Sequence, residues 1–314
     1  MTDSKRSRGE GGGDAAAGRS AWGGLSTEAR HPASRELDIL PTAEAVALLL
    51  EEDRRGIETA LHHREAIARA AEWVADALAG GGSVVFAGAG TSGRLGVLEA
   101  AECPPTFGTD PGRIRAVIAG GEGAVFRAAE GAEDREDDGR RAAEGLGPGD
   151  LLVGLSASSV TPFTRGALDA ARGRGARTVL LTCAAPAGLA ESADLVLALD
   201  TGPEVLTGST RLKAGSATKA VLNAITTAAM VRLGKVYENW MVDLRPGSAK
   251  LRDRSARIVA AAGGVERDRA ERLLAEAGGE VKTALVMALR GLPALEARRR
   301  LAASAGSVRR ALEE

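Results

Sequence analysis

Apolar and polar residues are arranged along the chain in blocks that predict strands and helices in turn. The segments between the apolar blocks repeat apolar residues every three to four positions, which is typical of amphipathic helices. Strands that alternate with helices form parallel sheets covered by helices on both faces. The sequence therefore predicts an α/β fold. The five apolar runs with the length of buried strands are residues 83–88, 114–120, 150–156, 177–183 and 195–199.

Further helices are predicted on either side of this alternating region. Residues 43–56 and 64–81 show helical spacing before the first strand, with Thr42 as the expected N-cap of the first helix. A long helix is predicted from near Lys213 to Gly234, followed by three or four short helices. We therefore divide the chain into three parts. They are a tail over residues 1–24, a ligand-binding catalytic domain over 25–253 that includes the N-terminal helices, and a small helical domain over 254–314.

Composition limits the compartment and the partners. The basic start of the chain is rich in Gly and Ala and lacks the apolar core of a secretory signal, so we expect a disordered tail. The net charge of −1 gives no indication of a nucleic-acid or membrane partner. Cys103 and Cys183 lie far apart and outside any metal-binding or redox spacing. We expect a cytoplasmic protein without a metal, whose partners are small molecules or copies of itself.

The loop after the first predicted strand is rich in glycine. Residues 88–93 read GAGTSG and contain the G-x-G-x-x-G pattern of dinucleotide sites. Glycines after a strand let backbone N–H groups approach an anion, and the N-terminus of the following helix adds a favourable dipole. A dinucleotide site also needs an acidic residue near the end of the second strand, where Glu122 lies. The loop alone leaves a dinucleotide and a simple phosphate ester as alternatives.

Hydroxyl groups in two loops favour the phosphate ester. Thr91 and Ser92 lie between Gly90 and Gly93 and add hydroxyl donors to the backbone N–H groups. Because the carboxyl ends of parallel strands meet at one edge of a sheet, a similar loop after the third strand can face the first. The sequence therefore predicts that two loops hold a phosphorylated sugar. The hydroxyl residues of the second loop are Ser156, Ser158, Ser159 and Thr161.

Longer motifs resemble a known family. The run GAGTSGRLGVLEAAECPPTFG at 88–108, with EGAED at 130–134, EVLTGSTRLKAG at 204–215 and ENWMVDL at 238–244, closely resembles the N-acetylmuramic acid 6-phosphate etherases of the sugar isomerase (SIS) superfamily. The resemblance implies a flavodoxin-like SIS fold and a lyase. Such a lyase cleaves the D-lactyl ether of N-acetylmuramic acid 6-phosphate, giving N-acetylglucosamine 6-phosphate and D-lactate in cell-wall recycling. It also implies a homodimer with sites near the subunit interface, and no metal or redox cofactor.

The implied reaction needs a base for the C2 proton of the open-chain sugar and an acid for the leaving ether oxygen. Matching the motifs gives Glu133 as the base and Glu102 as the acid. Glu102 also lies where Pro104 and Pro105 are expected to end a helix, and a negative charge there faces an unfavourable helix dipole. We therefore expect Glu102 to favour its protonated form.

The motifs assign three further residues. Ser209 and Lys213 are expected to contact the substrate, with the lysine as a point charge for the phosphate or the lactyl carboxylate. Glu204 is a third carboxylate beside a polar loop, and it has either an auxiliary role in ring opening or a structural role as a hydrogen-bond acceptor.

The chain departs from the family pattern at a few positions. Ser159 and Val160 occupy the places of a glycine and an arginine, His31 replaces an asparagine, and Gly247 and Ser248 replace Thr-Asn. One anion contact is lost with the arginine, which keeps a non-catalytic protein open as an alternative. An enzyme with the same loops and a different reaction is the other alternative. A phosphosugar aldose–ketose isomerase would also remove the C2 proton but would release no lactate. A non-catalytic sugar-phosphate sensor would bind without turnover.

Overall fold

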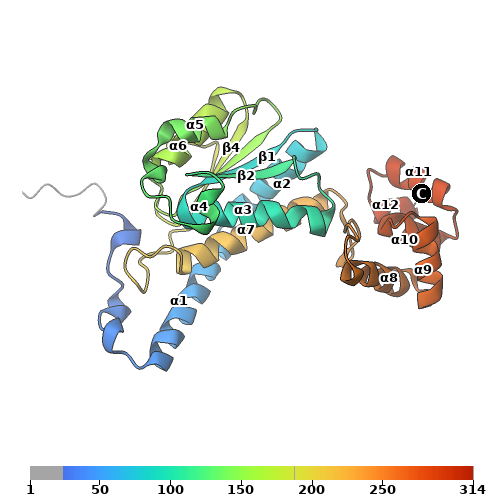
Figure 1. Cartoon of the computed structure of the whole chain (residues 1–314), viewed down its shortest axis with the longest axis horizontal. Coiled ribbons are helices and arrows are strands. Elements are labelled where there is room, and N and C mark those ends of the chain that lie inside the picture. The colour runs from blue at the N-terminus through green and yellow to red at the C-terminus, as the bar shows by residue number, and fades with distance from the viewer. Residues whose placement is uncertain (1–23, 187, 314) are drawn as a thin grey trace, which may run out of the picture.

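A five-stranded parallel sheet forms the centre of the protein, as the computed structural model shows for residues 24–186 and 188–313 (Figure 1). The strand order is β2-β1-β3-β4-β5, the doubly wound order of flavodoxin-like folds. All five predicted strands are confirmed. The predicted tail, apart from Gly24, lies outside the described residues. The strands are β1 (Val84–Gly88), β2 (Ile114–Ile118), β3 (Leu151–Leu155), β4 (Arg177–Thr182) and β5 (Leu195–Ala198).

Helices cover both faces of the sheet. Alternate strand residues point to opposite layers, so Phe86 packs in one apolar cluster and its neighbour Val85 in the other. One face is covered by α2 (Arg64–Ala79), α3 (Gly90–Phe107) and α7 (Lys213–Arg232), and the other by α5 (Glu136–Ala142) and α6 (Pro162–Gly173). Burial on both faces explains why the strands read as continuous apolar runs.

The N-terminal segment extends away from the sheet. Helix α1 (Thr42–His62) packs against α7, and the residues before it form a segment that we call the strap, residues 24–41 (Figure 1). The expected cap is wrong by one residue, because Pro41 is the N-cap and Thr42 is already helical. The strap contains only short 3-10 turns, at Ser26–Glu28, Pro32–Ser34 and Leu37–Ile39.

Helix α3 is longer than the sequence predicts. It continues through Pro104 and Pro105 to Phe107 and ends at Gly108, whose φ of 63° lets its N–H donate to the carbonyl of Pro104. Two prolines remove two backbone hydrogen bonds, but their fixed φ is compatible with a helix. The expectation that the prolines terminate the helix is therefore wrong. The smaller elements between the strands are α4 (Gly123–Phe126) and the 3-10 turns Ala132–Asp134 and Ala190–Ser192.

The C-terminal part packs around its own apolar cluster. Val242 and Leu244 belong to this cluster together with the C-terminal helices, which lie beside the sheet-containing body in Figure 1. The described residues contain five helices here rather than three or four, because short helices separated by only three or four residues are difficult to count from periodicity. The boundary at residue 254 stays a prediction. The elements are β6 (Val236–Tyr237), β7 (Trp240–Met241), α8 (Ala249–Gly263), α9 (Arg267–Glu276), α10 (Val281–Arg290), α11 (Ala294–Ala303) and α12 (Val308–Glu313).

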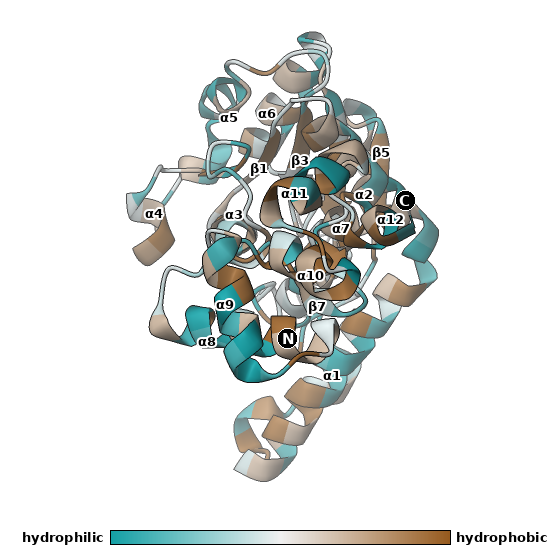
Figure 2. Ribbon diagram, turned by 90° about the vertical axis from the view of Figure 1, so that its right-hand side faces the viewer, coloured by the Kyte–Doolittle hydropathy of each residue, from teal (hydrophilic) through white to brown (hydrophobic). Residues whose placement is uncertain are grey.

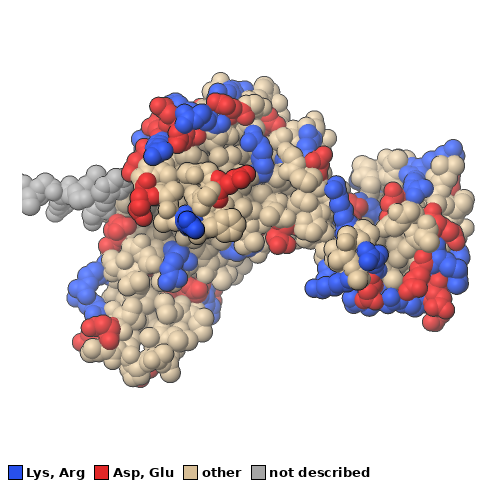
Figure 3. All heavy atoms as spheres, in the orientation of Figure 1, with Lys and Arg blue, Asp and Glu red and all other residues tan. Residues whose placement is uncertain are grey.

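None of the described helices combines the length and the apolar character that crossing a bilayer requires. On the face shown in Figure 3, acidic and basic side chains are interspersed over both parts of the molecule. This distribution agrees with the balanced composition and gives that face no strong field of one sign.

Candidate active site

A cavity of about 340 Å³ lies at the carboxyl edge of the sheet, beyond the ends of β1 and β3. These two strands are neighbours, while the chain from β1 runs first to β2 on the other side. Ligands of open α/β sheets bind at such a change of direction. The lining residues come from five segments: Leu25 and Glu28; Ala89, Gly90, Thr91 and Ser92; Glu133 and Asp134; Leu155, Ser156, Ala157, Ser158, Val160, Thr161 and Pro162; and Gly208 and Thr210.

The first loop forms the start of α3 at the cavity. Gly90 has a φ of 54°, a left-handed conformation that glycine adopts without strain. Gly93 does not line the cavity, but it is required by packing, because a Cβ there would lie 2.6 Å from the carbonyl oxygen of Gly88. Thr91 and Ser92 stand in the first turn of α3, where backbone N–H groups lack helical acceptors. This end of the cavity can hold an anion.

The second loop brings three of its four predicted hydroxyl residues to the cavity. Ser156, Ser158 and Thr161 line it, and the hydroxyl oxygens of Ser156 and Thr161 lie 2.8 Å apart. Ser159 is fully buried behind them with a φ of 63°, and its hydroxyl has no partner among the described residues. Left-handed backbone favours glycine, which explains why the glycine of the family pattern suits the position of Ser159. Val160, at the place of the family's arginine, also lines the cavity.

Carboxylates are the charged groups of the cavity. Glu133 and Asp134 line it from the turn Ala132–Asp134, and Glu28 lines it from the strap. Among the described lining residues none is Lys, Arg or His. The site therefore offers acceptors and a base, together with hydroxyl and backbone donors for a phosphate.

Glu102 does not line this cavity. It is exposed on α3, twelve residues after Gly90. At 1.5 Å per residue this spacing corresponds to about 18 Å along the helix axis. Glu99, one turn earlier, is buried and bound by Lys219 and Thr226 at 2.9 and 2.5 Å. Within one chain, the predicted acid Glu102 therefore lies away from the cavity that the predicted base Glu133 lines.

Lys213 and Glu204 do not line the cavity. The Lys213 ammonium is buried and donates to Glu52 and to the carbonyl of Pro203, each at 2.8 Å. The carboxylate of Glu204 accepts the backbone N–H groups of Lys213 and Ala214 at 3.0 and 2.9 Å, so it caps the start of α7. Burial raises the pKa of Glu204, although these two hydrogen bonds oppose the shift. Its contacts match the structural alternative.

Ser209 also falls outside the lining, although its neighbours Gly208 and Thr210 are part of it. The fold therefore brings the first loop (Gly90, Thr91 and Ser92) and Glu133 together with the second loop in one cavity. Three other predicted site residues, Glu204, Ser209 and Lys213, do not line this cavity.

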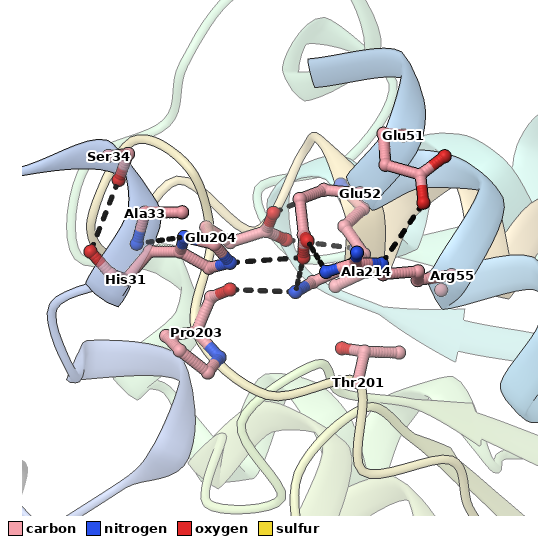
Figure 4. Close-up of polar contacts among 12 residues, drawn as sticks. His31, Ala33, Ser34, Glu51, Glu52, Arg55, Thr201, Pro203, Glu204 and Ala214 are labelled. Atoms are coloured by element: carbon pink, nitrogen blue, oxygen red, sulfur yellow. Dashed lines mark hydrogen bonds and ion pairs between the residues drawn. The ribbon is translucent and has the colours of Figure 1, made fainter. Parts of the chain in front are cut away.

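His31 joins this supporting network from the strap (Figure 4). Its Nε2 lies 3.1 Å from Oε2 of Glu52, and its Nδ1 accepts the N–H of Ala33 at 3.3 Å. Arg55 donates to the other oxygen of Glu52 at 2.8 Å. Burial by itself raises the pKa of Glu52, but the hydrogen bond and charge of Lys213, followed by those of His31, lower it overall. Glu52 is thus held in its ionised form, and its carboxylate contacts His31, Arg55 and Lys213.

Sequence reasoning missed three carboxylates near the site. Asp134 belongs to the EGAED motif and Glu28 lies before the first predicted helix, but sequence position alone does not show which side chains face a cavity. Glu52 looks like an ordinary charged residue of an amphipathic helix. The structure also explains Gly56 one turn later, where a Cβ would lie 2.4 Å from Cγ of Lys213.

Family profiles match the sheet-containing part of the chain. The profile described as glucokinase regulatory protein N-terminal SIS domain matches residues 66–172, and the SIS domain profile matches residues 130–228. A solved structure from Bacteroides fragilis, described as a phosphosugar isomerase involved in capsule formation, has a TM-score of 0.50 and 17% identity. It covers 66% of this chain and 99% of its own. At this identity the likeness shows the fold alone.

Two curated relatives cover almost the whole chain. The N-acetylmuramic acid 6-phosphate etherase of Rubrobacter xylanophilus is 51% identical over 294 residues, which are 93% of this chain and 97% of that protein. The etherase of Cutibacterium acnes is 50% identical over 291 residues, which are 92% and 96% of the two chains. With this coverage and the SIS sheet, the chain belongs to the N-acetylmuramic acid 6-phosphate etherase family.

Proposed function

We propose that this protein is a lyase that cleaves the D-lactyl ether of N-acetylmuramic acid 6-phosphate, with Glu133 as the base at the cavity beyond β1 and β3. The observation that carries the proposal is the presence of a carboxylate beside two hydroxyl-rich loops in one cavity. The products are N-acetylglucosamine 6-phosphate and D-lactate, which fits a role in recycling cell-wall amino sugars. The two free, buried cysteines fit a reducing, cytoplasmic location.

The phosphate of the substrate binds between the two loops. Thr91 and Ser92 offer hydroxyl and backbone donors at the start of α3, and Ser156, Ser158 and Thr161 offer hydroxyls from the opposite side. The helix N-terminus stabilises the dianion without a cationic side chain. The open-chain sugar then extends along the cavity towards Glu133.

The reaction is an elimination followed by an addition. Glu133 removes the proton from C2, the electron pair forms the C2–C3 double bond, and the bond from C3 to the lactyl oxygen breaks. Glu102 donates a proton to that oxygen, so lactate leaves with a hydroxyl group. A water molecule then adds its hydroxyl to C3, and C2 regains a proton. General acid and base groups of this kind contribute typically 10²- to 10⁴-fold each.

We further propose that the acid comes from the second subunit of a homodimer. Glu102 is exposed, and about 18 Å of helix separates it from Gly90 of its own subunit. In this arrangement, Glu102 of the partner subunit would reach the cavity that Glu133 lines and would supply the acid there. The protein then carries two sites, each made by both subunits, as a two-fold symmetric dimer requires.

An apolar face on α1 supports the dimer. Val46, Leu50, Ile57 and Leu61 are 44–66% exposed, and their spacing places them on one side of the helix. Brown, hydrophobic segments recur along the α1 ribbon in Figure 2. Exposed apolar stripes of this kind mark protein–protein contacts.

An isotope experiment tests the reaction and the two roles. The protein is incubated with N-acetylmuramic acid 6-phosphate in deuterated water, and D-lactate and deuterium at C2 are measured. Wild-type protein should release lactate and place deuterium at C2. Glu102→Ala should retain C2 exchange but release little lactate, whereas Glu133→Ala should lose both. The reverse pattern would overturn the assignment, and binding without lactate release would overturn the etherase itself.

A further inference from the structure

We infer that Glu28 is a further substrate-binding residue and that His31 positions it; this inference rests on the proposed function and deepens it. Glu28 belongs to the strap, far in sequence from the loops and from Glu133. Its carboxylate would accept a hydrogen bond from a hydroxyl or the acetamido N–H group of the sugar.

The position of Glu28 is the first argument. It lines the same cavity as Thr91, Ser92 and Glu133. A Cβ built on Gly208, another lining residue, would lie 3.2 Å from Oε2 of Glu28. Glu28 is an exposed residue and therefore lies at the open side of the cavity, beside the segment that leads into α7.

The availability of its carboxylate to a ligand is the second argument. None of the side-chain hydrogen bonds and ion pairs among the described residues involves the Glu28 carboxylate. An ionised carboxylate is acceptor-only, so it selects ligand groups that carry a proton to donate. It also repels the phosphate and the lactyl carboxylate, which favours binding of the phosphate at the hydroxyl loops.

The anchoring of the strap is the third argument. Thr27, next to Glu28, is fully buried, and His31 is 7% exposed. Through Glu52, His31 connects to Lys213, which in turn holds the carbonyl of Pro203. One buried network therefore fixes both the strap and the segment that contains Gly208. His31 acts through Glu28 and has no contact with the cavity of its own.

Kinetics and binding of Glu28→Gln test the substrate contact. We expect KM for N-acetylmuramic acid 6-phosphate, and Kd for N-acetylglucosamine 6-phosphate, to rise roughly tenfold. The Kd for inorganic phosphate should not rise, because the phosphate loops are untouched. Glu36→Gln on the same strap is the matched control and should change none of these values. Unchanged KM and sugar-phosphate Kd in Glu28→Gln would overturn the inference.

His31 is tested by a double-mutant cycle with the same assays. His31→Ala should raise KM as Glu28→Gln does, and the double variant should be no worse than either single variant. His31→Gln keeps an N–H donor for Glu52 and should restore KM. Additive effects, or a loss of phosphate binding as well, would overturn the positioning role. If wild-type protein releases no lactate, the proposed function fails, whereas the sugar-phosphate binding arm still decides the role of Glu28.

Discussion

The Nζ atom of Lys213 lies 2.8 Å from Oε2 of Glu52, and both side chains are only 4% exposed. The pair joins α1 to the start of α7 and supports the wall of the candidate active site. A buried ion pair costs desolvation to form, but the loss of one partner leaves a charge without compensation. This asymmetry makes the contact important for stability.

Glu52→Gln should therefore destabilise the protein. The expected loss in the free energy of unfolding at neutral pH is about 3 kcal/mol, because the Lys213 charge stays buried. Urea denaturation measures it. Glu51→Gln removes a neighbouring carboxylate that pairs with the exposed Arg54, and it should have little effect. Equal losses in the two variants would show that burial of the pair is not decisive.

Low pH should reduce the loss of unfolding free energy that Glu52→Gln causes. The pKa of Glu52 is lowered from its ordinary 4.5 in the folded state, so its contribution is complete above that value and is lost as pH falls through the lower folded pKa. At low pH the protonated Glu52 resembles glutamine. The difference in unfolding free energy between wild type and Glu52→Gln should shrink as the pH is lowered below 4.5. A constant difference would contradict the shift.

Mixing two inactive variants tests whether Glu102 acts across the interface. When Glu102→Ala and Glu133→Ala chains form mixed dimers, one site in each mixed dimer regains both glutamates. Random mixing of equal amounts should restore about a quarter of the wild-type lactate release. Each variant alone is the control. If both glutamates act within one subunit, mixing restores nothing.

A charge on the apolar face of α1 should break the dimer. Leu50 is 65% exposed at the centre of this face, so Leu50→Glu should yield monomers in analytical ultracentrifugation. Leu295 on α11 is 61% exposed and provides the matched control, Leu295→Glu, which should keep the wild-type mass. Dissociation by both variants or by neither would show that the interface lies elsewhere.

Ser159→Gly should stabilise the protein. Ser159 has a φ of 63° and a buried hydroxyl without a partner among the described residues. Glycine relieves the left-handed strain and removes the unsatisfied group, so the free energy of unfolding should rise by roughly 1 kcal/mol. Thermal denaturation measures the change. Ser158 in the same loop has no positive φ, so Ser158→Gly is the control and should not stabilise the protein. A rise in unfolding free energy for Ser158→Gly but not for Ser159→Gly would contradict this explanation.

The sequence by itself determined the strands and the family. Strands buried on both faces must be apolar throughout, so their positions are visible without any tertiary information. The glycine loop is equally local, because the turn into α3 requires Gly90 and Gly93 at fixed spacing. Resemblance over long motifs then assigned the chemistry, which composition and periodicity leave open. The roles of Glu102 and Glu133 still rest on that resemblance.

Only the tertiary structure decided which polar side chains face the cavity. Lys213 and Glu52 are 161 positions apart, and no pattern near either residue predicts that they meet in the interior. Their pairing moves Lys213 from the expected substrate contacts into the wall, while Glu28 enters the cavity from a strap without regular helices or strands. Glu102 lies on a helix whose length places it away from its own loop. Such outcomes depend on packing between distant segments, which local periodicity does not encode.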